Sequence, residues 1–270
     1  MIAFPNAKIN LGLNIINKRS DGYHNIETVF YPIPLHDVLE VVYAPVGTSD
    51  YTWHNSGLAI DAPAHENIVI KALNLVKKSH QLSPIAIQLH KVIPFGAGLG
   101  GGSADAAAMI QLLDQFFELG MTLEEQKRLA AQLGADCSFF IENKPSFATG
   151  IGDQLTPVSL SLTGYYLVLV KPNIHVSTPE AYSGVTPRTP TVGISEIIKR
   201  PVAEWREQLT NDFETSVFKK HPKIAAIKQQ LYNYGAIYAS MSGSGSSVFG
   251  LFEEPIEIDL DNCFVWQGRL

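Results

Sequence analysis

The sequence predicts an α+β protein of two domains, and three observations support this fold class. The first residues alternate between apolar and polar side chains, as in a β-strand with one buried face. A glycine-rich run near residue 100 leads into apolar residues at helical spacing. A second half begins with an apolar strand and ends with two strand-like segments around Gly and Ser residues. We therefore expect an N-terminal domain over residues 1–155 and a C-terminal domain over residues 156–270.

The start of the chain is expected to form antiparallel sheet. Residues 7–15 alternate strictly, which places Lys8 and Asn10 on the same face of a half-buried strand. An Asp-Gly turn then leads to a second strand over residues 26–31, and residues 38–43 are typical of a third.

Helices and one more strand follow in the first half. Asn67 is expected to cap a helix, and residues 85–90 to form a strand. After the glycine run, Ser103 is the expected N-cap of a long amphipathic helix. A capping box over residues 122–125 opens the next helix, which should end at Gly134.

The second half opens with an expected strand over residues 165–170. Helices are expected near residues 201–208, 212–219 and 222–234. The last two expected strands flank residues 242–247, a short run of Ser and Gly.

Composition limits the possible functions. The chain has 270 residues, of which 46% are hydrophobic and 17% charged, enough for a sizeable core. The net charge is −6 and the Lys and Arg residues are scattered, so we expect no nucleic-acid or membrane partner. Two cysteines without metal-ligand spacing, and the lack of a leader-like or spanning apolar segment, predict a soluble cytoplasmic protein without a disulfide framework or zinc site.

The glycine-rich run from Pro94 to Ser103 points most directly to a function. Between Gly96 and Gly102 only Ala97 and Leu99 carry side chains, so the backbone can approach a ligand closely and direct N–H groups at it. The first turn of the following helix adds unpaired N–H groups and the positive end of the helix dipole. The run therefore predicts a phosphate-binding loop rather than a flexible surface turn.

Other glycine-rich nucleotide motifs fit this run less well. It satisfies the dinucleotide pattern G-x-G-x-x-G, but the position about 20 residues on falls at a helix start instead of a strand end. The run lacks the lysine of a P-loop, and the chain has no His-Arg-Asp or Asp-Phe-Gly of protein kinases. A nicotinamide-binding oxidoreductase remains the alternative from a different class of protein.

Three motifs in this order resemble those of the GHMP kinases. They are a lysine-bearing first strand, the glycine-rich loop and a late Gly-Ser loop, at Pro5–Leu11, Pro94–Ser103 and Met241–Ser246. Further similar segments lie at Arg19–His24, Leu133–Phe140 and Asn211–Glu214, so the resemblance spans about residues 5–252. It is strongest to members that phosphorylate a cytidine-diphosphate-linked methylerythritol. The alternatives within the family act on mevalonate, homoserine or a sugar, and a catalytically inactive binding module on this fold is a third possibility.

The resemblance implies the GHMP kinase fold, with the active site in the cleft between two domains, and it implies ATP with Mg²⁺. It makes Lys8 the catalytic lysine and Asp136 the catalytic aspartate. Such a pair can lower the pKa of an acceptor hydroxyl and stabilise developing charge. Without the resemblance, Lys8 would be interpreted as a solvent-facing strand residue and Asp136 equally well as a helix N-cap.

The resemblance also implies the binding residues. For ATP they are Pro94, Phe95, Gly96, Ala97, Gly98, Leu99, Gly100, Gly101, Gly102, Ser103, Ala104 and Asn67. For the substrate they are Asn10, Tyr23, His24, Thr178, Tyr182, Ser242, Gly243, Ser244 and Gly245. The Tyr23-His24 pair and Tyr182 are expected on opposite faces of the cytosine, with His24 hydrogen-bonded to the base edge. Helix capping by Asn67, core packing of Tyr182 and a simple hairpin turn at residues 242–246 are the structural alternatives.

Two neighbouring positions depart from the family pattern. The residues after the glycines are Ser103-Ala104-Asp105, where Ser-Ser-Asn is commoner in the family. Asp105 would add a negative charge near the phosphates. The magnesium ligands therefore stay open, with Ser103 as one candidate, and Thr178 is interpreted also as the cap of a short helix.

Overall fold

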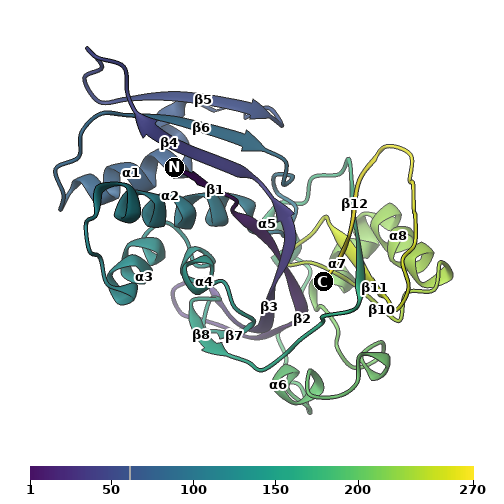
Figure 1. Cartoon of the computed structure of the whole chain (residues 1–270). Coiled ribbons are helices and arrows are strands. Elements are labelled where there is room, and N and C mark those ends of the chain that lie inside the picture. Colours follow the sequence, from purple (N-terminus) through teal and green to yellow (C-terminus); the bar gives the residue numbers. More distant parts are fainter. Residues whose placement is uncertain (61) are drawn as a thin grey trace. The chain divides into compact units, whose positions relative to one another are not determined.

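The computed structural model describes residues 1–60 and 62–270 and has three four-stranded sheets among its described strands (Figure 1). The chain forms two compact units, each built from separated stretches. Unit 1 comprises Met1–Ala7, Leu35–Phe95 and Gly100–Asn143, and unit 2 comprises Lys8–Pro34, Gly96–Leu99 and Lys144–Leu270. The mixture of helices with mainly antiparallel sheets confirms the α+β class. A division of the sequence between residues 155 and 156 stays a prediction.

Unit 1 contains a mixed sheet with the strand order β1-β4-β6-β5. Its strands are β1 (Ile2–Ala3), β4 (Val38–Tyr43), β5 (Tyr51–Gly57) and β6 (Ile85–Lys91). The β4 strand is antiparallel to β6, and β5 is parallel to it. Apolar residues alternate along β6, so Ile85, Ile87 and Leu89 are buried.

The helices of unit 1 pack around its longest helix. They are the 3₁₀ turn η1 (Ala64–Glu66), α1 (Ile68–Lys77), α2 (Gly101–Phe117), α3 (Leu123–Ala131) and α4 (Cys137–Glu142). The α2 helix contacts α1, α3 and α4. Asn67 caps α1 by accepting a hydrogen bond from Val69 N, and Thr122 with Glu125 forms a capping box on α3. These two caps confirm the sequence predictions.

The start of α2 differs from the prediction. Ser103 is not its N-cap, because the helix begins at Gly101 with Gly100 as the capping residue. Gly100 has a φ of 71°, a left-handed conformation that glycine adopts without steric cost, and it lets the helix start inside the glycine run. The hydroxyl of Ser103 is therefore located within the first helical turn.

Unit 2 contains the other two sheets. The first has the order β2-β3-β7-β8, with β2 (Asn6–Lys18), β3 (His24–His36), β7 (Ser146–Thr149) and β8 (Gln154–Pro157); β2 and β3 begin or end in unit 1. The second has the order β10-β11-β9-β12, with β9 (Tyr166–Pro172), β10 (Tyr238–Met241), β11 (Val248–Phe252) and β12 (Cys263–Arg269). Its three pairings are antiparallel.

The helices of unit 2 lie in its last stretch, residues 144–270. They are α5 (Thr178–Tyr182), α6 (Ile194–Ile197), the 3₁₀ turn η2 (Val202–Glu204), α7 (Phe213–Lys220) and α8 (Pro222–Asn233). Apolar residues of α7 and α8, including Val217 and Ile224, share one core with Val168, Val170 and Met241 of the second sheet. This core supports the turn between β10 and β11.

Four further predictions about local structure were wrong. The β2 strand is buried on both faces, because partners cover its polar side: Asn10 donates from Nδ2 to Thr28 Oγ1 at 3.0 Å. The strand at residues 38–43 belongs to a different sheet from β2 and β3. Residues 201–208 form only a 3₁₀ turn instead of a helix. Ser177, one residue before Thr178, caps α5 through Glu180 N.

Candidate active site

The glycine-rich loop joins β6 to α2 and uses its glycines for conformation and for space. Gly96, Gly98 and Gly100 have φ values of 56°, 75° and 71°, which side-chain-bearing residues rarely adopt. In unit 2, Gly98 lies so close to the Gly-Ser turn that a Cβ atom there would be 1.9 Å from the Ser242 carbonyl oxygen. A side chain at Gly98 would therefore force these two loops apart.

The loop ends in a helical turn with free capacity for an anion. The first helical hydrogen bond of α2 runs from Ala104 N to Gly100 O at 2.9 Å. The N–H groups of Gly101, Gly102 and Ser103 precede that bond, so the helix itself does not use them. Together with the helix dipole, these groups favour a negatively charged ligand, as the sequence indicated.

Lys8 lies against this loop within unit 2. Its Nζ donates to Asn10 Oδ1 at 2.7 Å and to Gly98 O at 3.2 Å, and it lies 4.8 Å from the centre of the Phe30 ring. Its backbone N–H donates to Leu99 O at 2.9 Å. Only 4% of Lys8 is exposed. Lys8 is therefore a buried residue in contact with the loop, and not the solvent-facing lysine that the strand pattern alone suggests.

The Gly-Ser turn contacts the same loop. It connects the antiparallel strands β10 and β11, so it is a hairpin turn, and its Gly245 N–H closes the turn on Ser242 O at 3.0 Å. The Ser242 hydroxyl donates to Gly98 O at 2.8 Å and accepts from Asn10 N at 3.2 Å. The predicted substrate residues Asn10 and Ser242 therefore meet beside Gly98. Gly243 and Ser244 continue this turn.

Asp136 is at the start of α4 in unit 1. It occupies the N-cap position, but its side chain makes no capping hydrogen bond. Cys137 follows it, and burial raises the pKa of the Cys137 thiol to about 11, opposed by a hydrogen bond with Ser103. The start of α4 thus lies at the first turn of α2, where the glycine loop ends. Lys8 and Asp136 belong to different units, so their meeting at one hydroxyl stays a prediction.

A buried ion cluster that the sequence analysis missed holds both ends of the glycine loop within unit 1. The Nζ of Lys91 pairs with Asp37 and, at 2.7 Å, with Asp105 Oδ2. Asp37 Oδ1 also accepts from the backbone N–H groups of Val92 and Ile93, at 2.6 and 2.8 Å. The cluster thereby joins the end of β6 to the first turns of α2.

Asp105 does not present its charge as the sequence suggested. It is 2% exposed, and burial raises its pKa to about 8, with the charge of Lys91 opposing and that of Asp37 adding to the rise. The expectation of an extra charge beside the phosphates is therefore wrong, because Lys91 draws the carboxyl into the interior. The only sequence signal was the departure from the family at this position.

The predicted cytidine residues lie together in unit 2, although in an unexpected arrangement. The rings of His24 and Tyr182 stack on each other, with centroids 4.6 Å apart and planes 19° apart. Tyr182 also contacts the edge of Phe213 at 4.8 Å. Burial, with a smaller contribution from Lys18, lowers the pKa of His24. Tyr23 is 62% exposed, so its ring is available to a ligand.

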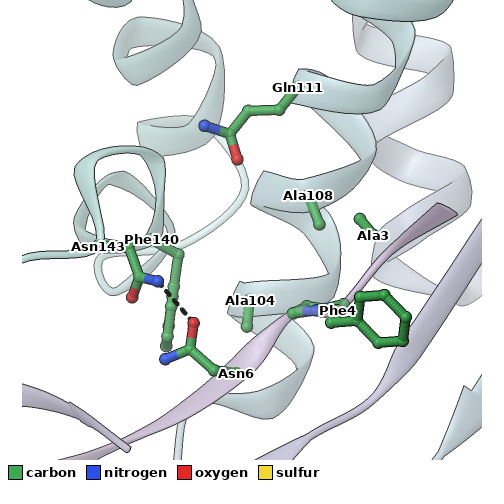
Figure 2. A pocket seen from close by; sticks show the side chains of 9 residues that line it. Ala3, Phe4, Asn6, Ala104, Ala108, Gln111, Phe140 and Asn143 are labelled. Atoms are coloured by element: carbon green, nitrogen blue, oxygen red, sulfur yellow. Dashed lines mark hydrogen bonds between the residues drawn. The ribbon is translucent and has the colours of Figure 1, made fainter. Parts of the chain in front are cut away.

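A small cavity in unit 1 lies beside α2. It has a volume of about 120 Å³ and is lined partly by Asn6 and Asn143, whose side chains are joined by a 2.6 Å hydrogen bond (Figure 2). Ala104 is the single predicted ATP residue in its lining. The cavity is therefore not the predicted nucleotide site, and Ala104 is buried against it.

The remaining predicted ATP residues have structural roles as well. Asn67 Oδ1 accepts from Val69 N at 2.9 Å, so capping α1 accounts for this residue. Phe95 is exposed, with its ring centre 5.5 Å from Lys91 Nζ, and Pro94 precedes it in unit 1. Among residues 1–60 and 62–270, no three His, Cys, Asp or Glu side chains gather as they would around a metal ion. In the same part of the chain, none of the helices combines the length and hydropathy needed to span a bilayer.

Comparison with known proteins shows what the chain is similar to. Residues 67–144 match the family model for the GHMP kinases N terminal domain, and residues 194–260 match that for GHMP kinases C terminal. The 4-diphosphocytidyl-2-C-methyl-D-erythritol kinases of Parabacteroides distasonis and Bacteroides fragilis are 57% and 56% identical, over the full length of both chains. That of Chlorobium limicola is 41% identical and aligns over 94% of this chain and 88% of its own.

Solved structures agree with these sequence matches. A crystal structure of 4-(cytidine 5'-diphospho)-2C-methyl-D-erythritol kinase is 32% identical, with a TM-score of 0.81 over 94% of this chain and 91% of its own. The Methanococcus jannaschii mevalonate kinase, at 12% identity and a TM-score of 0.70 over 100% and 98% of the two chains, shares the fold. The chain belongs to the GHMP kinases and, among them, to the family of the 4-diphosphocytidyl-2-C-methyl-D-erythritol kinases.

Proposed function

We propose that this chain transfers the γ-phosphate of ATP to the 2-hydroxyl of 4-diphosphocytidyl-2-C-methyl-D-erythritol, a step of the non-mevalonate route to isoprenoid precursors. Relatives named 4-diphosphocytidyl-2-C-methyl-D-erythritol kinase match this chain over their whole length. The observation that carries the proposal is the contact of Lys8 Nζ with Gly98 O, because it joins a buried cation to a phosphate-type loop. We expect the enzyme to work in the cytoplasm.

Lys8 and Asp136 have complementary roles in this proposal. Lys8 is held by Asn10 at 2.7 Å, so its ammonium can face charge that develops as the phosphoryl group moves. Asp136 orients the acceptor hydroxyl and accepts its proton. The protein has little covalent work to do, and most of the rate enhancement comes from positioning and electrostatics.

The glycine loop binds the phosphates of ATP through backbone N–H groups at residues 96–103, and Pro94, Phe95, Ala104 and Asn67 border the nucleotide. Magnesium fits this site as an ion held mainly by the phosphates, since Mg²⁺ usually keeps few protein ligands. When Mg²⁺ is bound, its positive charge offsets the negative charge of the triphosphate. The Ser103 hydroxyl, in the first turn of α2, is the candidate protein ligand.

The cytidine end of the substrate is recognised by the aromatic residues of unit 2. Tyr23 and the stacked pair of His24 and Tyr182 supply aromatic faces, and stacking on one such face is worth ~1–3 kcal/mol per base. A base that enters between the faces must separate His24 from Tyr182. Thr178, in the first turn of the helix that ends at Tyr182, and residues 242–245 complete the substrate contacts.

An assay with two acceptors tests the proposal. The purified protein is incubated with ATP, Mg²⁺ and either the cytidine-linked methylerythritol or methylerythritol without the cytidine diphosphate, and phosphorylated product is measured. We expect turnover of the linked acceptor alone. Equal turnover of both would remove the aromatic residues from the site, and turnover of mevalonate or homoserine in a parallel panel would replace the proposed substrate.

The catalytic pair is tested separately. Asp136→Asn should lower kcat by about 100-fold or more while ATP still raises the melting temperature. Asp261→Asn, a surface change of the same kind, is the matched control. If Lys8 and Asp136 act on one hydroxyl, the double variant Lys8→Met, Asp136→Asn should be no slower than the slower single variant. Multiplicative losses would show that the two residues act at separate places.

A further inference from the structure

Asn211 is a buried amide whose hydrogen-bonding groups are all used. It is 2% exposed, and its Nδ2 donates to the carbonyl oxygens of Met241 and Gly243 at 2.8 and 2.9 Å. Its Oδ1 accepts from Phe213 N at 3.0 Å. Because carbonyl oxygens only accept, these partners require an amide here, and an aspartate would place negative charge against two of them.

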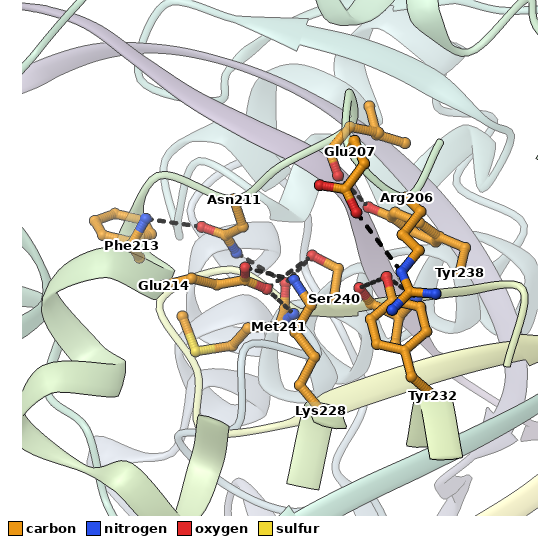
Figure 3. A network of polar contacts seen from close by, with 12 residues as sticks. Arg206, Glu207, Asn211, Phe213, Glu214, Lys228, Tyr232, Tyr238, Ser240 and Met241 are labelled. Atoms are coloured by element: carbon orange, nitrogen blue, oxygen red, sulfur yellow. Dashed lines mark hydrogen bonds and ion pairs between the residues drawn. The ribbon is translucent and has the colours of Figure 1, made fainter. Parts of the chain in front are cut away.

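Glu214 holds the same backbone from its other side. Its Oε1 accepts from Met241 N at 2.8 Å and from the Ser240 hydroxyl at 3.2 Å. Its Oε2 pairs with Lys228 Nζ at 2.7 Å. Figure 3 shows Asn211 and Glu214 both directed at Met241, the last residue of β10. The N–H and the C=O of Met241 are thus both fixed by side chains of this one segment.

The segment is also attached to the strand that carries Lys8. Leu13 N donates to Thr210 O at 2.9 Å, and Asp212 N donates to Leu13 O at 2.8 Å. Ile15 N donates to Asp212 Oδ2 at 2.8 Å. Residues 210–214 therefore join β2 to the start of the Gly-Ser turn. They fix the position of that turn relative to β2.

Ser242, the residue after Met241, connects the start of the Gly-Ser turn to the surroundings of Lys8. It accepts from Asn10 N at 3.2 Å and donates to Gly98 O at 2.8 Å. Asn10 and Gly98 both accept a hydrogen bond from Lys8 Nζ. A displacement of the turn would move both acceptors of the lysine.

We propose that Asn211 is a positioning residue for phosphoryl transfer. It fixes the backbone at Met241 and Gly243, so that Ser242 holds Asn10 and Gly98 where they orient the ammonium of Lys8. This inference rests on the proposed catalytic role of Lys8. A misplacement of about 1 Å in a catalytic group can reduce a rate by about 100-fold, so an indirect hydrogen bond is enough to matter.

The test compares Asn211→Asp with Asn233→Asp, the same change at an exposed position near the end of α8. The kcat per folded molecule and both KM values are measured, with the folded fraction taken from circular dichroism. We expect kcat of Asn211→Asp to fall about 10- to 100-fold with KM values within about threefold, and Asn233→Asp to match wild type. A kcat that falls only in proportion to the folded fraction would overturn the inference.

A second comparison separates positioning from a general structural effect. Ser242→Ala removes the hydroxyl through which Asn211 acts, so the double variant should be no slower than the slower single variant. Losses that multiply would overturn the inference. If Asn211→Asp does not fold, Asn211→Ala, which removes the bonds without adding charge, is judged by the same criteria. If wild type and Asn233→Asp fail to phosphorylate the cytidine-linked alcohol, the proposed function fails; if they are active and the Asn211 variants equal them, this inference alone fails.

Discussion

Replacing Asp105 by asparagine should make the folded protein more stable at alkaline pH. The carboxyl group is buried beside Lys91 and Asp37, and burial raises its pKa from 3.8 to about 8. Between these pH values the folded state keeps a proton that the unfolded state has lost. Stability therefore falls as the pH rises through this range, and a neutral side chain of the same shape avoids that loss.

The size of the effect follows from the pKa. Ionisation of the unfolded chain is almost complete at pH 5.5, and the folded carboxyl becomes charged near pH 8. A free energy of about 1.4 kcal/mol per pH unit over that interval makes a difference of roughly 3 kcal/mol. We expect the unfolding free energy of Asp105→Asn to exceed that of wild type by about this much more at pH 8.5 than at pH 5.5.

Urea denaturation at the two pH values measures this difference. Asp261→Asn, which removes one negative charge from the surface, is the matched control and should follow wild type at both pH values. If the difference between Asp105→Asn and wild type is the same at pH 5.5 and 8.5, Asp105 does not change its protonation in this range. The reasoning from its burial would then be refuted.

Three further changes test the loop and its surroundings. Lys91→Met leaves two buried carboxyls without their cation and should lower the unfolding free energy by about 3–5 kcal/mol in urea titrations; an unchanged midpoint would contradict this. Gly98→Ala places a methyl group against Ser242 O and should reduce kcat/KM for ATP by about 100-fold or more, whereas wild-type kinetics would mean that the loop adjusts freely. His24→Ala removes the ring that stacks on Tyr182 and should raise KM for the cytidine substrate about 5- to 100-fold with KM for ATP unchanged; an equal rise in both would place His24 outside the cytidine site.

Local features of the fold were predictable because their causes are local. The strand over residues 38–43 was predicted with its exact bounds, and Asn67 and the 122–125 capping box form the expected hydrogen bonds. Each depends on side-chain alternation or on a cap within three residues. The contact of Lys8 with the glycine loop involves residues 90 positions apart, and the sequence suggested it only through resemblance.

Features that depend on distant partners were not predictable. An alternating strand normally exposes its polar face, yet Asn10 and its neighbours on β2 are buried because Thr28 and Ser242 cover them. Asp105 resembles a surface residue until Lys91, 14 positions earlier, is placed beside it. The start of α2 was mispredicted for a local reason instead: Gly100 adopts a positive φ, so the helix begins at Gly101 without a side-chain cap.

The ordering of the glycine loop explains why it suits an anion. Glycines lose much conformational entropy on folding, so other contacts must hold the loop in place. Its carbonyl groups provide these contacts. Ala97 O accepts from Ser247 N, and Leu99 O accepts from Lys8 N. Between them, Gly98 O accepts from both the Ser242 hydroxyl and Lys8 Nζ. Where consecutive carbonyls are turned into the protein and glycine φ values are positive, the N–H groups can converge outward on a single ligand. The protein thus satisfies these three acceptors of the loop itself, which supports the proposal that the donors of the loop bind a phosphate.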